Sequence, residues 1–290
     1  MKHCDTVLHR GNSVIQHGHF NNRIYVMKLA PEDIPDIIRY ADDLARKEGY
    51  TKIFVKVPES SVGVFANDRY ITEATVPFFF HGRESAVFMA KYLDPKRKEV
   101  GDATDTAYVL TDAFCHIGES HAYRVPNGFS LMHAHAGDAK DIAALYQSVF
   151  KTYPFPISDP DYIRETMQAK IRYFVIRKSH QLAAVASCEI DSDNLNIEVT
   201  DFATAPLFRG NGFAGILLHA IENLLDINPN VSRSYRIGST SLKILCQSPI
   251  HFFVVTAKDF GYIRVLSLDI ETRSALSVEQ QLLPDSHPVL

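Results

Sequence analysis

The stretch Asp201-Phe-Ala-Thr-Ala-Pro-Leu-Phe-Arg-Gly-Asn-Gly-Phe-Ala214 leads from strand-like residues through Pro206 into a glycine-containing loop and then into an apolar helix. A helix N-terminus leaves four backbone N–H groups without intrahelical partners and carries roughly half a positive charge. Gly210 and Gly212 allow the backbone to approach a ligand closely, and Arg209 adds a permanent cation. The stretch therefore predicts a binding site for a pyrophosphate group.

The loop differs from the two best-known phosphate loops. No Gly-Lys-Ser/Thr follows it, as a Walker A motif requires, and the Gly-x-Gly-x-x-Gly of a dinucleotide fold is absent. The pattern that it does match, Arg/Gln-x-x-Gly-x-Gly/Ala, arises by accident in roughly one chain in three of this length. Its place between a strand and a strongly apolar helix over 213–225 is what makes it informative.

The residues before the loop predict a three-stranded antiparallel meander. Strand-like runs cover 172–177, 181–190 and 196–204, and short polar turns join them as hairpins. Further upstream we expect a strand over 129–135 and two helices. The first helix has Asp138 as its N-cap, and the second covers 160–170 after the prolines that follow Tyr153 break the chain.

The first hundred residues alternate strand and helix patterns, which predicts an α/β class. We expect strands at 22–29, 52–57 and 70–80, helices at 31–48 and 61–66, and either a helix or a late strand at 85–92. Residues 94–106 are charged and poor in large apolar groups, as in a linker. We therefore predict a smaller α/β domain at 1–105 and a second domain at 125–290.

Composition excludes several classes of protein. The chain has 290 residues, of which 46% are hydrophobic and 22% charged, so it can bury a core, and its net charge of −4 offers no general attraction for nucleic acid. No apolar run approaches the ~20 residues that span a bilayer. The scattered cysteines predict free thiols in a reducing compartment, and hence a soluble cytoplasmic protein. They are Cys4, Cys115, Cys188 and Cys246.

Two histidine pairs invite a metal hypothesis. His17 and His19, and likewise His133 and His135, are spaced to share one face of a strand. No cysteine or carboxylate is spaced to complete either site, so we interpret these residues as ordinary surface or core histidines and expect no metal.

The order of elements around Arg209-Gly-Asn-Gly-Phe-Ala214 resembles the GCN5-related N-acetyltransferase (GNAT) superfamily, and longer phrases resemble its β-lysine N-acetyltransferases. The resemblance spans about residues 14–225 in segments. It implies a mixed, mostly antiparallel sheet flanked by helices, acetyl-CoA as co-substrate and β-lysine as acceptor. The phrases are IQHGHFNNRIYVMKL, GYTKIFVKVPES, VPFFFHGRESAVFMAKY, YPFPISDPDYI and SCEIDSDNLNIEVTDFATAPLFRGNGFA.

The resemblance also assigns the cofactor contacts. It implies that one strand hydrogen-bonds the pantetheine arm through its backbone, and that the loop holds the pyrophosphate. The strand residues are Phe202, Ala203 and Thr204, and the loop residues are Arg209, Gly210, Asn211, Gly212, Phe213 and Ala214.

By the same resemblance, Glu198 stands six residues before Thr204, where several members carry a general base. A lysine-like amine has a pKa near 10.4 and must lose a proton before it attacks a thioester, so a carboxylate there is chemically sensible. Glu198 can equally be an exposed strand residue without a role. Asp201 and Tyr153 are candidates for contact with the substrate, Tyr153 as part of a lid. A salt bridge and a proline connector are their structural alternatives, and Asp201 shares a face with Glu198 only if a bulge intervenes.

The chain departs from the family after about residue 238. The following stretch lacks the expected helix, and only Tyr262, in an aromatic-Gly-Tyr context, remains as a weak candidate for the acid that protonates the leaving thiolate. We interpret this ending as an altered reading frame near residue 238, which the other two frames of the encoding DNA would test.

The sequence leaves function open between three readings. The preferred one is an N-acetyltransferase for β-lysine, a small-molecule amine. The alternatives are a non-catalytic acyl-CoA sensor, and an acetyltransferase for another polyamine, an aminoglycoside or a protein lysine. The N-terminal half resembles the closing half of the same fold without its loop, as a degenerate copy would. No nucleic acid or membrane partner is expected, and the oligomeric state stays open.

Overall fold

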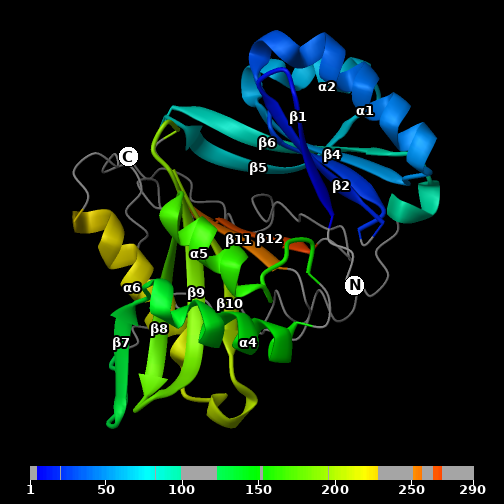
Figure 1. Cartoon of the computed structure of the whole chain (residues 1–290). Coiled ribbons are helices and arrows are strands. Elements are labelled where there is room, and N and C mark those ends of the chain that lie inside the picture. The colour runs from blue at the N-terminus through cyan, green and yellow to red at the C-terminus, as the bar shows by residue number, and fades with distance from the viewer. Residues whose placement is uncertain are drawn as a thin grey trace, which may run out of the picture.

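The computed structural model describes residues 5–19, 21–81, 83–98, 123–150, 153–194, 196–227, 251–256 and 264–269. These residues form two six-stranded sheets, ordered β1-β2-β3-β4-β6-β5 and β12-β11-β10-β9-β8-β7 (Figure 1). Each sheet is therefore built from strands of one half of the chain.

The first sheet is mixed. Its strands β3 and β4 are parallel, joined by a crossover helix, and its other neighbouring pairs are antiparallel. Its strands are β1 Thr6–Arg10, β2 Ser13–Gly18, β3 Arg23–Lys28, β4 Lys52–Pro58, β5 Ile71–Phe80 and β6 Glu84–Tyr92. Its helices are α1 Ile34–Glu48 and α2 Val62–Asn67.

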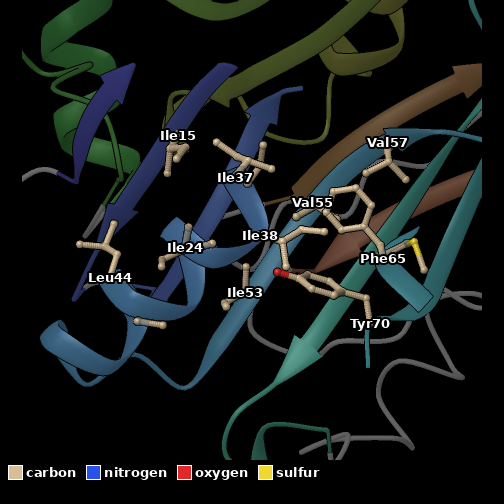
Figure 2. Close-up of a cluster of buried hydrophobic side chains, with 14 of the residues drawn as sticks. Ile15, Ile24, Ile37, Ile38, Leu44, Ile53, Val55, Val57, Phe65 and Tyr70 are labelled. Carbon is tan, nitrogen blue, oxygen red and sulfur yellow. The ribbon is translucent and has the colours of Figure 1, made fainter. Parts of the chain in front are cut away.

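Helices α1 and α2 cover one face of this sheet, the face turned away from the second sheet (Figure 1). Helix α1 places apolar residues at helical spacing and ends at Gly49, which takes the left-handed conformation with a φ of 74°. Alternate residues of the strands, such as Ile24 and Ile53, pack against Ile37 and Phe65 of the helices, as Figure 2 shows. Burial of this apolar surface stabilises the layer.

The opposite face of the first sheet is different in character. Tyr25, Phe54, Phe79 and Phe88 form a second apolar cluster on it. Polar residues such as Lys56 share this face because side chains alternate along a strand. This face looks toward the second half of the chain (Figure 1).

In the second sheet, every pair of neighbouring strands is antiparallel over the described residues. Helix α6 packs on one face, and helices α4 and α5 pack on the other. The strands are β7 Phe129–His133, β8 Ile171–Lys178, β9 Gln181–Asp191, β10 Asn196–Thr204, β11 His251–Thr256 and β12 Arg264–Asp269. The helices are α4 Ala139–Val149, α5 Pro160–Gln168 and α6 Phe213–Ile227.

Most of the expected elements are confirmed, including the meander β8-β9-β10 and the helix after the loop. Residues 85–92 belong to strand β6 rather than to a helix, and strands β1, β2, β11 and β12 were not expected. Asp138 occupies the N-cap of α4, as predicted, but its side chain makes no capping hydrogen bond to this helix. Its carboxylate accepts a hydrogen bond from the His135 backbone N–H and pairs with Arg177.

The described residues include polar contacts that join the two halves. The His81 N–H donates to the Asn194 carbonyl at 2.8 Å, so the β5–β6 turn is tied to the β9–β10 turn. The Asp5 N–H donates to the Pro154 carbonyl at 3.0 Å. An ion pair between Lys56 and Glu198 also joins the halves.

Two regions of interest lie outside the described residues. The first is 99–122, which includes most of the linker predicted at 94–106, and the second is the chain after residue 227 apart from β11 and β12. Among the helices of the described ranges, none is both long and apolar enough to cross a membrane.

Candidate functional site

Strand β10 contains a bulge. Its register with β9 shifts between Thr200 and Ala203, and Asp201 adopts a φ of 52°, in the left-handed region. Three side chains hold this conformation: the Tyr146 hydroxyl donates to the Asp201 carbonyl at 3.0 Å, the Ser187 hydroxyl donates to its carboxylate at 2.9 Å, and the Tyr153 hydroxyl donates to the other carboxylate oxygen. A strained residue fixed by several partners is typical of functional sites.

The bulge decides where two of the predicted residues lie. In a regular strand Glu198 and Asp201 would face opposite ways. With the extra residue, both side chains line the same cavity. The structure therefore contains the bulge that Glu198 and Asp201 need in order to share one face of the strand.

Beyond the bulge, β10 separates from its other neighbour. Within the described residues, β10 pairs with β11 only at Val199 and Phe253. The backbone of 202–204 continues to pair with β9 on one side, through Ala203 and Thr204, and on the other side it has an open edge, with no strand partner among the described residues. Such an edge can donate and accept hydrogen bonds to an extended ligand.

The glycine loop, residues 209–214, connects β10 to α6. Gly210 and Gly212 have φ values of 83° and 71°, a conformation that side chains disfavour. A Cβ atom built on either glycine meets no heavy atom within 4 Å, so open space lies beside the backbone at both positions. Asn211 closes the loop internally, because its side-chain amide donates to the Phe208 carbonyl at 2.9 Å.

The loop ends at the first turn of α6, where the Ile216 N–H donates to the Gly212 carbonyl at 3.2 Å. The N–H groups before it have no helical partner. Phe213 is 2% exposed and packs in the core, which anchors the helix start, while Arg209 is exposed beside it. Unpaired donors, open space and a cation fit a pyrophosphate group.

A cavity of about 840 Å³ lies between the two sheets, and we call it the inter-sheet cavity. Seven carboxyl side chains and three lysines line it, so its potential favours a cation. The carboxylates are Glu32, Glu84, Glu189, Asp191, Asp193, Glu198 and Asp201, and the lysines are Lys28, Lys56 and Lys170.

Glu198 lies among charges from both sheets. It is directly opposite Glu189 of β9, and the Lys56 ammonium of β4 lies 3.7 Å from its carboxylate. Like charges placed opposite each other destabilise a sheet, and the lysine offsets that repulsion. Burial, with the nearby charge of Glu198, raises the pKa of Glu189. Burial opposes the charge of Lys56, yet Tyr25 and Glu198 outweigh it and raise the pKa of Lys56.

The Asp201 carboxyl lies in a less polar part of the same cavity. Burial raises its pKa, although the hydrogen bonds from Tyr153 and Ser187 oppose the shift. Burial and the adjacent Asp201 raise the pKa of the Tyr153 phenol well above its usual range, so this hydroxyl remains a donor at neutral pH.

The predicted residues thus fall into two groups. The loop residues and the strand residues 202–204 gather at the start of α6 and along β10, and Glu198, Asp201 and Tyr153 line the inter-sheet cavity. Tyr262 lies outside the described residues.

The four histidines of the metal hypothesis serve structural contacts. His17 Nδ1 lies 2.9 Å from the Tyr50 hydroxyl, and the His19 ring packs against the same tyrosine. His133 packs against Phe174, and His135 caps a short helical turn. No three His, Cys, Asp or Glu side chains of the described ranges are placed to hold a metal ion.

Sequence reasoning missed four residues of the site. Glu189 could have been found, because the short hairpin turn sets it opposite Glu198. Ser187 follows from the same register. Gln16 and Lys56 come from the other sheet, and no local pattern places them at the cavity.

Comparisons with known proteins show what this chain is similar to. The family model described as Acetyltransferase (GNAT) family matches residues 142–233. A β-lysine N(6)-acetyltransferase of Methanococcus maripaludis is 30% identical over 89% of this chain and 90% of its own length. The N-acetyltransferase YodP of Bacillus subtilis is 29% identical over 72% of this chain and 75% of its own. A solved tandem GNAT protein from the clavulanic acid biosynthesis pathway covers 78% of this chain and 71% of its own at 15% identity, with a TM-score of 0.39.

Proposed function

This chain belongs to the acetyltransferase (GNAT) family, within the group of β-lysine N6-acetyltransferases, and from this membership we propose that it acetylates β-lysine on N6. It is an N-acetyltransferase that uses acetyl-CoA. The acceptor and the roles of individual residues are the proposal.

The acidic lining of the inter-sheet cavity supports β-lysine as the acceptor. The inter-sheet cavity is lined by Glu189, Asp191, Glu198 and Asp201, and it reaches the bulge of β10, where the open strand edge begins. β-Lysine bears two ammonium groups and one carboxylate, so it is a net cation at neutral pH. An acidic cavity beside the edge that would hold the thioester suits such an acceptor.

Acetyl-CoA would supply an activated acetyl thioester. The glycine loop would hold its pyrophosphate through the backbone N–H groups at the start of α6 and through Arg209. The open edge of Phe202, Ala203 and Thr204 would bind the pantetheine arm and orient the carbonyl for attack.

Glu198 is the proposed general base. The N6 ammonium loses its proton to Glu198, directly or through water, because only the free amine is nucleophilic. The amine nitrogen then forms a bond to the acetyl carbon, the carbon–sulfur bond breaks, and the sulfur leaves as a thiolate while the nitrogen releases its second proton to water. Tyr262 is the proposed acid that returns a proton to the thiolate.

Asp201 and Tyr153 are proposed to position the acceptor. The Asp201 carboxylate can pair with an ammonium group, and the Tyr153 hydroxyl holds that carboxylate in place. The cost of burying Asp201, visible as its raised pKa, is offset when a cation binds beside it.

The product, N6-acetyl-β-lysine, is a compatible solute. We therefore propose a role in osmoadaptation, with the enzyme acting in the cytoplasm where such solutes accumulate.

A free-thiol release assay with acetyl-CoA and a panel of amines tests the proposal. The panel contains β-lysine, α-lysine, spermidine, an aminoglycoside and a lysine-containing peptide. We expect the highest kcat/KM with β-lysine. Faster turnover of another amine would replace the acceptor, and acetyl-CoA binding without turnover of any amine would favour the acyl-CoA sensor.

A further inference from the structure

The face of the first sheet that borders the inter-sheet cavity carries a row of hydrogen-bond donors. Gln16 of β2 is directly opposite Tyr25 of β3, which is aligned with Phe54 of β4, two residues before Lys56. Residues at this spacing share one face of a sheet. Gln16, Tyr25 and Lys56 all line the cavity.

Gln16 and Lys56 donate no side-chain hydrogen bond to any group in the described part of the chain. Gln16 is 3% exposed, and its side-chain Nε2 is buried without a hydrogen-bond partner in the described part of the chain. A buried amide without a partner is unfavourable, so such groups in native proteins call for an explanation.

The Lys56 ammonium also has N–H donors that make no hydrogen bond to the described residues. Its side chain is 15% exposed, and its ion pair with Glu198, at 3.7 Å, is longer than a hydrogen bond. Its ammonium also lies 4.8 Å from the centre of the Phe79 ring. Among the described residues no group accepts a hydrogen bond from this ammonium, which can donate three.

The opposite wall has the complementary character. Glu189, Asp191 and Glu198 lie on β9 and β10, and when ionised they only accept hydrogen bonds. Around these residues the cavity therefore has donors from β2 and β4 on one side and acceptors from β9 and β10 on the other. A ligand with ammonium groups at one side and a carboxylate at the other would satisfy both walls.

We propose that Gln16 and Lys56 bind the carboxylate of the acceptor, so that the first sheet makes the enzyme select diamino acids over diamines. This inference rests on the proposed function and adds to it the group that the N-terminal half recognises. One amide N–H and one ammonium provide a donor for each carboxylate oxygen. The ammonium groups of the acceptor then face the carboxylates of β9 and β10.

The test compares two acceptors that differ only in the carboxyl group. 1,4-Diaminopentane is β-lysine without its carboxylate and retains both amines at the same spacing. For the wild-type enzyme we expect kcat/KM for β-lysine to exceed that for 1,4-diaminopentane by about tenfold or more, a typical loss when a charged hydrogen-bonding group is missing.

Three variants sharpen the comparison. Lys56→Met and Gln16→Leu should reduce the preference for β-lysine to within about threefold, mainly through a higher KM for β-lysine. Gln16→Glu should reduce the preference for β-lysine further, because the new carboxylate at position 16 would repel the carboxylate of β-lysine. The ratio of the two substrates is the readout because both react through Glu198, so any effect of Lys56 on Glu198 cancels. Lys47→Met, on the outer side of α1 and 78% exposed, is the matched control and should keep the wild-type ratio.

The possible results distinguish a failure of the proposed carboxylate site from a failure of the proposed acetyltransferase function. If the wild-type enzyme acetylates both substrates equally well, the carboxylate site is refuted while the acetyltransferase stands. If folded Lys56→Met and Gln16→Leu slow both substrates by the same factor, the two residues do not read the carboxylate. If neither substrate is acetylated, the proposed function fails and the inference fails with it. Thermal melting and acetyl-CoA affinity report folding, and the wild-type ratio and Gln16→Glu remain informative if one variant does not fold.

Discussion

The glycine loop and the inter-sheet cavity contribute to one proposed active site in different ways. The loop consists of consecutive residues, 209–214, and offers mainly backbone N–H groups. The cavity gathers side chains from β2, β4, β9 and β10, which belong to two sheets. Backbone N–H groups can bind the cofactor that all members of a family share. Side chains brought together from distant parts of the chain can determine which acceptor amine is bound. The loop should therefore control acetyl-CoA affinity, and the cavity should control the acceptor and its deprotonation.

The largest effect is expected at Glu198, where a substitution should lower turnover without changing acetyl-CoA affinity. Glu198→Gln should lower kcat by about 10²- to 10⁴-fold, the usual contribution of a general base, and leave the Kd of acetyl-CoA nearly unchanged. The deficit should shrink as pH rises, because free amine becomes more abundant. A pH–rate profile and calorimetry provide the measurement. Glu165→Gln, on the exposed side of α5, is the matched control. A wild-type profile in Glu198→Gln would remove this residue from the mechanism.

The next effect concerns the loop. Gly212→Val places a branched side chain at a φ of 71° and fills the open space beside the backbone. We expect acetyl-CoA affinity to fall by about tenfold or more, equivalent to ~1.4 kcal/mol of binding free energy. Calorimetric titration measures this directly. Gly63→Val, at an exposed position of α2, serves as control. Unchanged affinity in folded Gly212→Val would break the assignment of the loop.

Asp201→Asn should affect the acceptor and not the cofactor. We expect KM for β-lysine to rise by about tenfold, since the neutral amide cannot pair with an ammonium. Equal KM values in the two proteins would end the binding role of Asp201.

The same variant makes a prediction about stability. The pKa of Asp201 is raised above its ordinary value of 3.8, so the folded protein holds this proton more tightly than the unfolded chain does. The resulting stabilisation is present below pH 3.8 and is lost as pH rises through the folded-state pKa. Asp201→Asn should therefore lose less unfolding free energy than wild type as pH increases above 3.8. Urea unfolding at several pH values tests this, and parallel curves would contradict the burial of Asp201.

The smallest effect concerns the support of the bulge. Ser187→Ala removes the hydroxyl that donates to Asp201 at 2.9 Å and lies 2.8 Å from the Thr200 hydroxyl. We expect a loss of about 0.5–1.5 kcal/mol in unfolding free energy, the usual net contribution of a hydrogen bond, with acetyl-CoA affinity retained. Ser148→Ala, on α4, is a control because its hydroxyl donates only to a local carbonyl. Equal stability of wild type and Ser187→Ala would show that the bulge holds without this contact.

Local patterns predicted the meander β8-β9-β10 and the helix after the loop, because these strands are hairpin neighbours and the loop lies between a strand and an apolar helix. Strands β11 and β12 of the same sheet were not predicted. Strands β1 and β2 were not predicted from the sequence because several of their residues are polar. These residues, such as His9 and Gln16, lie at exposed or cavity-facing positions. The bulge at Asp201 depends on Tyr146, Tyr153 and Ser187, none of which is adjacent to it in sequence. Contacts between the halves, such as that of Lys56 with Glu198, exist only after both sheets have formed.

The proposed acetylation of β-lysine on N6 is tested most directly by the identity of the product. Wild-type enzyme, acetyl-CoA and β-lysine are incubated, and two-dimensional NMR of the mixture assigns the acetylated nitrogen. The proposed function, which rests on the similarity to β-lysine N6-acetyltransferases, predicts a single product acetylated on N6. Acetylation on N3, or no acetylated β-lysine while another amine in the panel is consumed, would contradict it.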